Sequence, residues 1–119
     1  MSNKDVEEQC IKIVIDYEKK QGRIAQRIPQ GKGYDVESTG RQIEVKGHKG
    51  NKPPFALLNG NNIKGLQKAE NWFLYIVYNL TDNPKIIILT KAETLSKVIP
   101  SMIWEVPLRK INYDNAKSV

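Results

Sequence analysis

Two carboxylates and a lysine are spaced for chemistry in the segment GKGYDVESTGRQIEVKG, residues 31–47. The segment is typical of two short strands joined by a Thr-Gly turn, because Gly suits the positive φ angle of two-residue hairpins. In that register Asp35 lies opposite Glu44, and Lys46 follows on the same face. Opposed like charges are destabilising, so the pair of acids requires a reason for being kept together, such as a compensating charge. A bound Mg²⁺ or Mn²⁺ ion would supply one, since these ions prefer oxygen ligands.

This arrangement predicts chemistry on a phosphate group. We expect Asp35 and Glu44 to be metal ligands, and the backbone carbonyl of Val45 to add a further oxygen. Lys46 beside the ion would orient a water molecule or stabilise charge on a phosphate in the transition state. Two other interpretations fit the same pattern: the charged face is simply solvated, or the register slips by one residue and separates the two acids.

The elements that must position these residues follow from the apolar periodicity of the chain. Residues 4–20 have helical spacing and end near Gly22, and residues 72–80 are almost wholly apolar, as in a strand buried on both faces. Further strands are predicted over 23–29, 33–38, 41–47, 83–90 and 102–107, and further helices over 61–71 and 91–99. We expect residues 47–60 to be mostly loop. The order predicts an α/β fold with a central mixed β-sheet flanked by α-helices.

Length and composition favour a single domain over residues 1–119, with a polar, flexible tail over 107–119. Apolar residues make up 39% of the chain and charged residues 27%, which is typical of a globular protein rather than a disordered one. Cys10 is the only cysteine, so an intrachain disulfide is impossible. Without a signal-peptide pattern or an apolar run of membrane-spanning length, we expect a cytoplasmic protein with no membrane partner.

The positive charge of the chain favours a nucleic-acid partner. The net charge is +6, and the segment KGHKGNK, residues 46–52, is rich in lysine and holds no acid. Lys49 and Lys52 in this segment, with Lys64 and Lys68 in the second predicted helix, are expected to bind a phosphate backbone with salt-sensitive affinity. His48 is a candidate for a further phosphate contact, although we favour a loop histidine with no such role.

The motif in its setting resembles a known nuclease family. Asp35, Glu44 and Lys46, in YD…IEVK, match the core of the PD-(D/E)xK nuclease superfamily. With YEKKQG before it and FLYIVYNL after it, the segment is similar to the carboxy-terminal domain of the plant NO VEIN protein and its microbial relatives. The layout is also similar to that of archaeal Holliday-junction resolvases, and the resemblance covers roughly residues 5–90. It implies a restriction-endonuclease-like α/β fold and metal-dependent hydrolysis of phosphodiester bonds.

The resemblance also implies roles for further residues. It gives the two acids and the lysine the roles already described, and it adds Glu18 as a catalytic residue, because many members carry a glutamate on the first helix. A surface position would explain Glu18 equally well. Relatives often carry an acid at the start of the second helix, where this chain has NGNNIKG. Gln67 from that helix and Glu37 near the hairpin turn are auxiliary candidates.

We therefore expect a metal-dependent endonuclease that hydrolyses DNA, with RNA left open as a substrate. Tyr34, Trp72 and Tyr75 are candidates for base stacking, although the last two fit a core strand better. The alternative is a catalytically inactive nuclease-fold module that binds nucleic acid or a protein. A homodimer is also compatible with the sequence, because duplex cleavage needs two active sites, and the apolar stretch MIWEV, residues 102–106, is a candidate interface.

Overall fold

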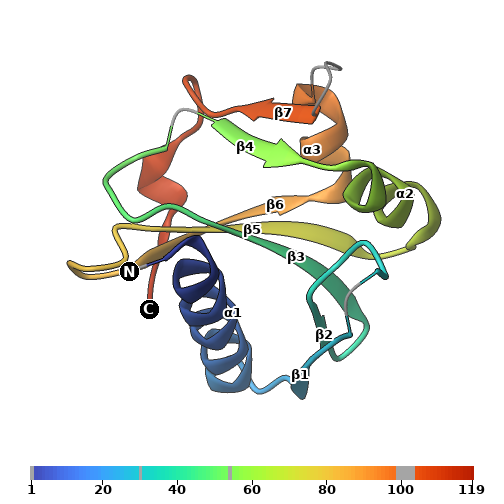
Figure 1. Cartoon of the computed structure of the whole chain (residues 1–119), viewed down its shortest axis with the longest axis horizontal. Helices are drawn as coiled ribbons and strands as arrows, with labels where there is room; N and C mark the ends of the chain where they lie inside the picture. Colours follow the sequence, from blue (N-terminus) through green and yellow to red (C-terminus); the bar gives the residue numbers. More distant parts are fainter. Residues whose placement is uncertain (1, 30, 54, 99–103) are drawn as a thin grey trace.

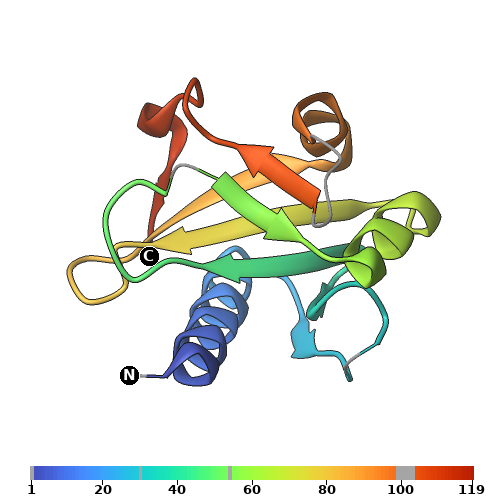
Figure 2. The same ribbon diagram turned by 45° about the horizontal axis from the view of Figure 1, so that its top comes forward.

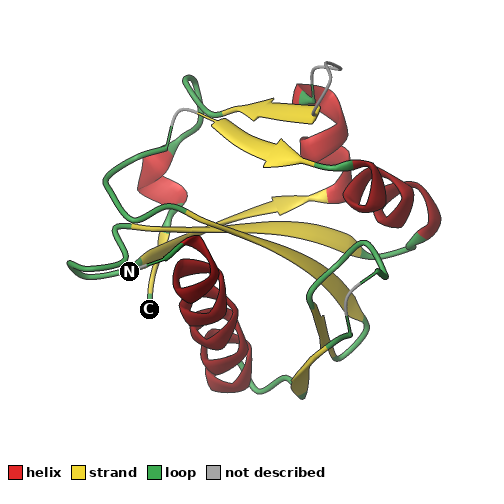
Figure 3. Ribbon diagram, viewed as in Figure 1, coloured by secondary structure: helices red, strands yellow, loops and turns green. Residues whose placement is uncertain are grey.

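The computed structural model describes residues 2–29, 31–53, 55–98 and 104–119, and it places helices on both sides of a β-sheet (Figure 1; Figure 3). The elements are α1 (Asn3–Lys20), β1 (Ala25–Arg27), β2 (Val36–Ser38), β3 (Arg41–Gly47), β4 (Phe55–Leu58), α2 (Gly60–Lys68), β5 (Trp72–Tyr78), β6 (Lys85–Thr90), α3 (Lys91–Lys97), β7 (Trp104–Pro107), the 3₁₀ turn η1 (Tyr113–Asn115) and β8 (Lys117–Ser118). This α/β architecture confirms the predicted fold class.

The larger sheet has the strand order β1-β2-β3-β5-β6-β8, and it is mixed because β3 and β5 are parallel while the other neighbours are antiparallel. The prediction of one sheet is wrong, because β4 and β7 pair with each other in a separate two-stranded sheet. β4 falls in the Gly- and Pro-rich segment that predicted only loop. Its four residues alternate between exposed and buried, which is too short a run to identify a strand without its partner.

The predicted hairpin register is confirmed for three pairs. Val36 lies opposite Ile43, Glu37 opposite Gln42 and Ser38 opposite Arg41. Both turn residues have positive φ angles, 33° at Thr39 and 83° at Gly40, as a two-residue hairpin turn of this kind requires. Because the register does not slip, the residues on alternate positions of β3 keep the faces that the sequence predicts for them.

The two faces of the larger sheet bury separate cores. One face packs against α1 through Cys10, Ile11 and Val14, which meet Ile43 and Val45 of β3. The other face packs beneath α2, β4 and β7, and its core holds buried side chains from all of these elements and from β5 and β6. Every residue of β5 except Phe73 is buried, which confirms the predicted central strand. Glu44 and Lys46 alternate with Ile43 and Val45, so they point toward the α2 side of the sheet.

Several element boundaries differ from the prediction. The first strand is only three residues long, with Ala25 buried and Ile24 83% exposed, so Ile24 does not face the core as expected. The carboxy-terminal segment contains η1 and β8, and β8 pairs with β6. The predicted edge strand over 102–107 corresponds to β7, and residues 102 and 103 of that prediction lie outside the described residues. Residue 99, the last of the third predicted helix, also lies outside them. Within the described residues, none of the helices has the length and apolarity needed to span a lipid bilayer.

A close contact between two glycines holds α2 against the loop that leads to Asp35. A Cβ atom added at Gly65 would lie 2.7 Å from the carbonyl oxygen of Gly33, and Gly33 itself has a φ of +82°. Trp72 reinforces this contact, because its Nε1–H donates a hydrogen bond of 3.3 Å to the same carbonyl. Gly65 therefore allows an approach that no other residue permits, although glycine within a helix is intrinsically unfavourable.

We expect Gly65→Ala to destabilise the protein by about 1–3 kcal/mol, because the overpacking outweighs the gain of roughly 1 kcal/mol in helix propensity. Urea denaturation measures this change. The control is Gly60→Ala in the same helix, since a Cβ atom there meets nothing within 4 Å. Equal stabilities of the two variants would contradict the proposed contact.

Candidate active site

Asp35 lies directly before β2, and it continues the hydrogen bonding between the two hairpin strands by one further residue. Its backbone N–H donates to the carbonyl of Ile43 at 2.8 Å, and its Oδ2 accepts the N–H of Val45 at 2.9 Å. A carboxylate thus stands where the next backbone carbonyl of a longer strand would be. This pair of hydrogen bonds fixes the Asp35 carboxylate against the edge of β3, at the point where β2 begins.

The backbone of Val45 points to the same place. In an extended strand, the N–H and C=O groups of one residue project to the same side of the strand. The Val45 N–H reaches Asp35, so its carbonyl also projects toward this edge of β3, beyond the last residue pair of β2. The position agrees with the role as an oxygen ligand that the sequence predicts for this carbonyl.

Glu44 is the most perturbed acid of the candidate site. Its side chain is buried, with the residue only 4% exposed, and its Oε2 lies 3.2 Å from Nζ of Lys46. Burial, together with the nearby charge of Asp35, raises the pKa of Glu44 to about 8, although Lys46 acts in the opposite direction. A buried acid next to a second acid is a place where an added cation would relieve both effects.

The three predicted residues share one hollow. Asp35, Glu44 and Lys46 line a cavity of about 290 Å³, which is closed on one side by the amino-terminal end of α2. The side chain of Asn59 caps this helix by accepting the N–H of Asn62 at 2.9 Å. The first turn of α2 contains no acid, as the segment NGNNIKG indicated. We call this cavity the acidic hollow.

Glu7 is the residue from α1 that lines the acidic hollow, and sequence analysis missed it. It lies on the first turns of the helix, where apolar periodicity gives no signal for which polar residue faces a cavity. The structure does not bring Glu18 into this site. The two glutamates are eleven residues apart, which is about 16 Å along the helix at 1.5 Å per residue.

Glu18 instead belongs to a buried polar network at the other end of α1. Its side chain is fully buried and accepts two hydrogen bonds from Arg23, at 2.6 and 2.8 Å, and one from Tyr75 Oη, at 2.9 Å. Arg41 in turn donates to Tyr75 Oη at 2.8 Å. Burial alone would raise the pKa of Glu18, but the hydrogen bonds from Arg23 and Tyr75 outweigh it and lower the pKa. This ion pair explains Glu18 without catalysis.

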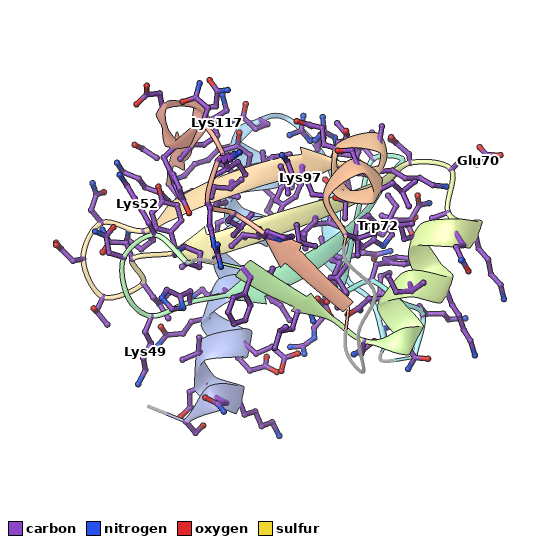
Figure 4. All side chains as sticks on the ribbon, turned by 90° about the horizontal axis from the view of Figure 1, so that it is seen from above. Lys49, Lys52, Glu70, Trp72, Lys97 and Lys117 are labelled. Atoms are coloured by element: carbon purple, nitrogen blue, oxygen red, sulfur yellow. The ribbon has the colours of Figure 1, made fainter. Side chains whose placement is uncertain are left out.

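The predicted basic residues lie in two groups on either side of the acidic hollow. Lys64 and Lys68 line a neighbouring cavity of about 260 Å³ beside α2, and His48 lines another of about 340 Å³ at the end of β3. Lys49 and Lys52 are exposed at the end of the molecule opposite Glu70, which follows α2 (Figure 4). Lys52 also lies over the ring of Tyr113, at 5.2 Å.

The two auxiliary candidates are not brought into the site. Gln67 is exposed on α2, and Glu37 is exposed on β2 opposite Gln42. Neither of them lines the acidic hollow. Trp72 and Tyr75 are fully buried in β5, which agrees with a core role for them, whereas Tyr34 is partly exposed and lines the hollow.

The donor set fits a hard divalent cation. Two carboxylates and a carbonyl that projects toward them are the oxygen ligands that Mg²⁺ and Mn²⁺ prefer. Among the described residues, no three acids, histidines or cysteines come close enough together to hold an ion by themselves. An ion held by Asp35 and Glu44 would therefore complete its shell with the Val45 carbonyl, water and substrate oxygens, as Mg²⁺ commonly does.

Fold and sequence together define the class of the protein. The mixed sheet with helices on both faces is consistent with a restriction-endonuclease-like architecture. The chain belongs to the family described as "Protein NO VEIN, C-terminal", whose model matches residues 6–89. A search of curated proteins found no match to the chain. The matched residues include all those that line the acidic hollow, and the family match suggests a nuclease-like domain.

Proposed function

We propose that this protein is a metal-dependent endonuclease that hydrolyses phosphodiester bonds of DNA in the acidic hollow. The observation that carries the proposal is the convergence of Asp35, Glu44 and Lys46 on one cavity, with Glu44 buried beside a second acid. Burying Glu44 beside the partly exposed Asp35 costs stability, and a cation and a phosphate would make use of that arrangement. The net charge of +6 is in keeping with a polyanionic substrate.

Each residue of the hollow has a role that its position allows. Asp35, Glu44 and the Val45 carbonyl would hold Mg²⁺ or Mn²⁺, and this ion would supply charge neutralisation at the phosphate and activation of water. The Lys46 ammonium, anchored 3.2 Å from Glu44, would donate a hydrogen bond to a phosphate oxygen and stabilise negative charge in the transition state. Glu7 faces the same space from α1 and would orient the attacking water.

The test is cleavage of a panel of DNA substrates: supercoiled plasmid, a four-way junction, a flap and single strands, with Mg²⁺, Mn²⁺ or a chelator. We expect cutting only with a metal ion, and Lys46→Ala should reduce its rate by about 100- to 1,000-fold, as for the loss of one transition-state donor. A wild-type protein that leaves every substrate intact with both ions would overturn the proposal.

Replacing Glu7 distinguishes the acid that lines the hollow from Glu18, the acid that the family resemblance suggested. We expect Glu7→Gln to slow cleavage by about 100-fold, the low end of the range for a side chain that acts on the attacking water. Glu18→Gln should keep the wild-type rate per folded molecule, because Glu18 is bound to Arg23 outside the hollow. Initial rates, corrected for the folded fraction by circular dichroism, measure both. The reverse order of effects would assign catalysis to Glu18.

A second candidate function has a specific observation in its favour. The first turn of α2, which borders the hollow, carries no acid where related domains often have one. A catalytically inactive module that binds nucleic acid would not need an acid at this position. It predicts salt-dependent DNA binding that Glu44→Ala leaves intact or strengthens, together with no cleavage at any metal concentration.

A homodimer through the segment around β7 is a further proposal, and sedimentation of the protein with and without DNA would test it.

A further inference from the structure

Three hollows lie in a row along β3. The basic hollow, about 260 Å³, is bordered by Lys64 and Lys68 of α2 and by Tyr34. The acidic hollow comes next, and it shares Tyr34 with the basic one. The apolar hollow, about 340 Å³, is lined by the end of β3 and by β4, and it shares Lys46 with the acidic one. Figure 2 shows the two strands that line it. Each hollow therefore shares a lining residue with the next, and we call the three together the groove.

Alternate residues of one strand form the floor of this groove. Gln42 lines the basic hollow, Glu44 the acidic hollow, Lys46 the acidic and apolar hollows, and His48 the apolar hollow. The strand stays extended through His48, whose N–H donates to Val77 of β5 at 2.8 Å. At about 3.3 Å per residue, the floor is roughly 20 Å long. Several nucleotides of one strand fit this length, since stacked nucleotides are about 3.4 Å apart.

The two ends of the groove differ in chemistry. The basic end offers exposed ammonium groups, which suit phosphates. The apolar end offers Phe55 and Leu57 of β4, which are 43% and 39% exposed and rank among the exposed large apolar residues of the described chain. An exposed aromatic ring beside a cationic groove is a platform on which bases stack. Phosphates alone would leave both apolar side chains facing a charged backbone.

This combination selects against a continuous duplex. In duplex DNA the faces of the bases are stacked on each other, and a protein reaches only phosphates, sugars and base edges. An unpaired strand offers phosphates and base faces together, which is what the two ends of the groove would contact. The acidic hollow lies between these ends, with Lys46 at the boundary of the apolar hollow.

We propose that the groove binds an unpaired polynucleotide strand, with phosphates at Lys64 and Lys68, the reacting phosphate beside Lys46 and a base stacked on Phe55. This inference rests on the proposed function for the role of the acidic hollow, and it names the substrate class as single strands, flaps and open ends. It also assigns Phe55 as a residue that sets this preference.

Binding of a short fluorescent oligonucleotide tests the inference without any cleavage. The wild-type protein in chelator is titrated with the same sequence as single-stranded DNA, single-stranded RNA and duplex DNA, and fluorescence anisotropy is measured. We expect single strands to bind at least about 10-fold more tightly than duplex. Phe55→Ala, in the same background, should weaken single-strand binding by about 5- to 100-fold, as for the loss of one stacked base, and leave duplex binding unchanged.

Matched controls separate the groove from general surface effects. Leu95→Ala removes an exposed apolar side chain on α3, outside the three hollows, and should not change binding. Phe55→Leu keeps an apolar side chain but removes the ring, so it reports on stacking if the alanine variant fails to fold. Replacing Lys64 and Lys68 by Gln should lower both the affinity and its salt dependence. The same change at Lys19 and Lys20, exposed on α1, should not.

The outcomes distinguish this inference from the proposed function. Equal affinity for duplex and single strands, or unchanged binding after Phe55→Leu and Phe55→Ala, would overturn the inference even if the wild-type protein cuts DNA. Single-strand binding that depends on Phe55, in a protein that never cuts, would support the groove and end the nuclease proposal. A preference for single-stranded RNA over DNA would support the groove and the role of Phe55, and it would identify RNA as the nucleic acid that binds there.

Discussion

Glu44→Gln is expected to stabilise the metal-free protein while it removes metal-dependent cleavage. Burial beside Asp35 raises the pKa of Glu44 to about 8 in the folded protein, against 4.5 for an ordinary glutamate. Between these two values the unfolded chain ionises Glu44 and the folded chain does not, so stability falls as the pH rises from 4.5 to 8. Gln keeps the shape and cannot ionise, so the variant escapes this loss.

The gain should be near zero at pH 4.5 and reach its full size above pH 8, on the order of 2–4 kcal/mol, since one pKa unit corresponds to about 1.4 kcal/mol. Thermal melts in chelator at pH 5 and pH 8.5 measure it. Glu37→Gln, at an exposed position of β2, is the control and should change little at either pH. A gain of the same size at both pH values would mean that the buried charge of Glu44 is not its cause.

Added Mg²⁺ should stabilise the wild-type protein but not Glu44→Gln. An ion held by Asp35 and Glu44 needs both in their ionised form, so its binding would release a proton from Glu44 below pH 8. Millimolar Mg²⁺ should therefore raise the melting temperature of the wild-type protein and leave that of Glu44→Gln nearly unchanged. Loss of cleavage in the same variant, with the fold intact, would tie the activity to the acid that destabilises the metal-free state.

The second large effect is expected at Glu18. Replacing it by Ala leaves Arg23 and the hydroxyl of Tyr75 without their buried acceptor, and removing one member of a buried ion pair commonly costs several kcal/mol. Because Arg23 is partly exposed, with 23% of its side chain accessible, we expect a loss of about 2–4 kcal/mol at pH 7. Urea denaturation with a common slope for both proteins measures it.

Glu8 provides a matched control on the same helix. It also pairs with an arginine that follows α1, Arg27, but both side chains are largely exposed. Glu8→Ala should therefore cost far less stability than Glu18→Ala, because solvent screens an exposed ion pair. The pKa of Glu18 is lowered in the folded state, so its stabilisation is present above pH 4.5 and is lost as the pH falls through its folded pKa. Equal losses in the two variants would contradict the buried network.

The sequence was sufficient for the parts of the fold that local pattern specifies. The turn residues and the alternation of β3 predicted the hairpin register, and with it the shared face of Glu44 and Lys46. The apolar run of β5 predicted its central place. In both cases the signal lies within a few neighbouring residues, and a one-residue error would have reversed every side chain.

The parts that the sequence did not predict depend on partners far along the chain. β4 and β8 are short, and they are strands only because β7 and β6 pair with them. Glu18 has the spacing of an inward-facing residue, but its role depends on Tyr75, 57 positions away. Gly65 looks like a weak point of α2, and only its contact with Gly33 explains it. Glu7 enters the site because of where α1 lies against the sheet, which helical periodicity does not specify.

The parallel pairing of β3 with β5 has a consequence for the newly made chain. Parallel neighbours need a long connection, and here that connection contains β4 and α2, which form the walls of the groove. The hairpin with Asp35 and Glu44 is local and can form early, whereas the non-local pairing with β5 is slower. On the ribosome, Asp35 and Glu44 would therefore come together in the hairpin before the cavity around them has formed. The nascent chain should then lack a complete site until β5 has emerged and paired with β3.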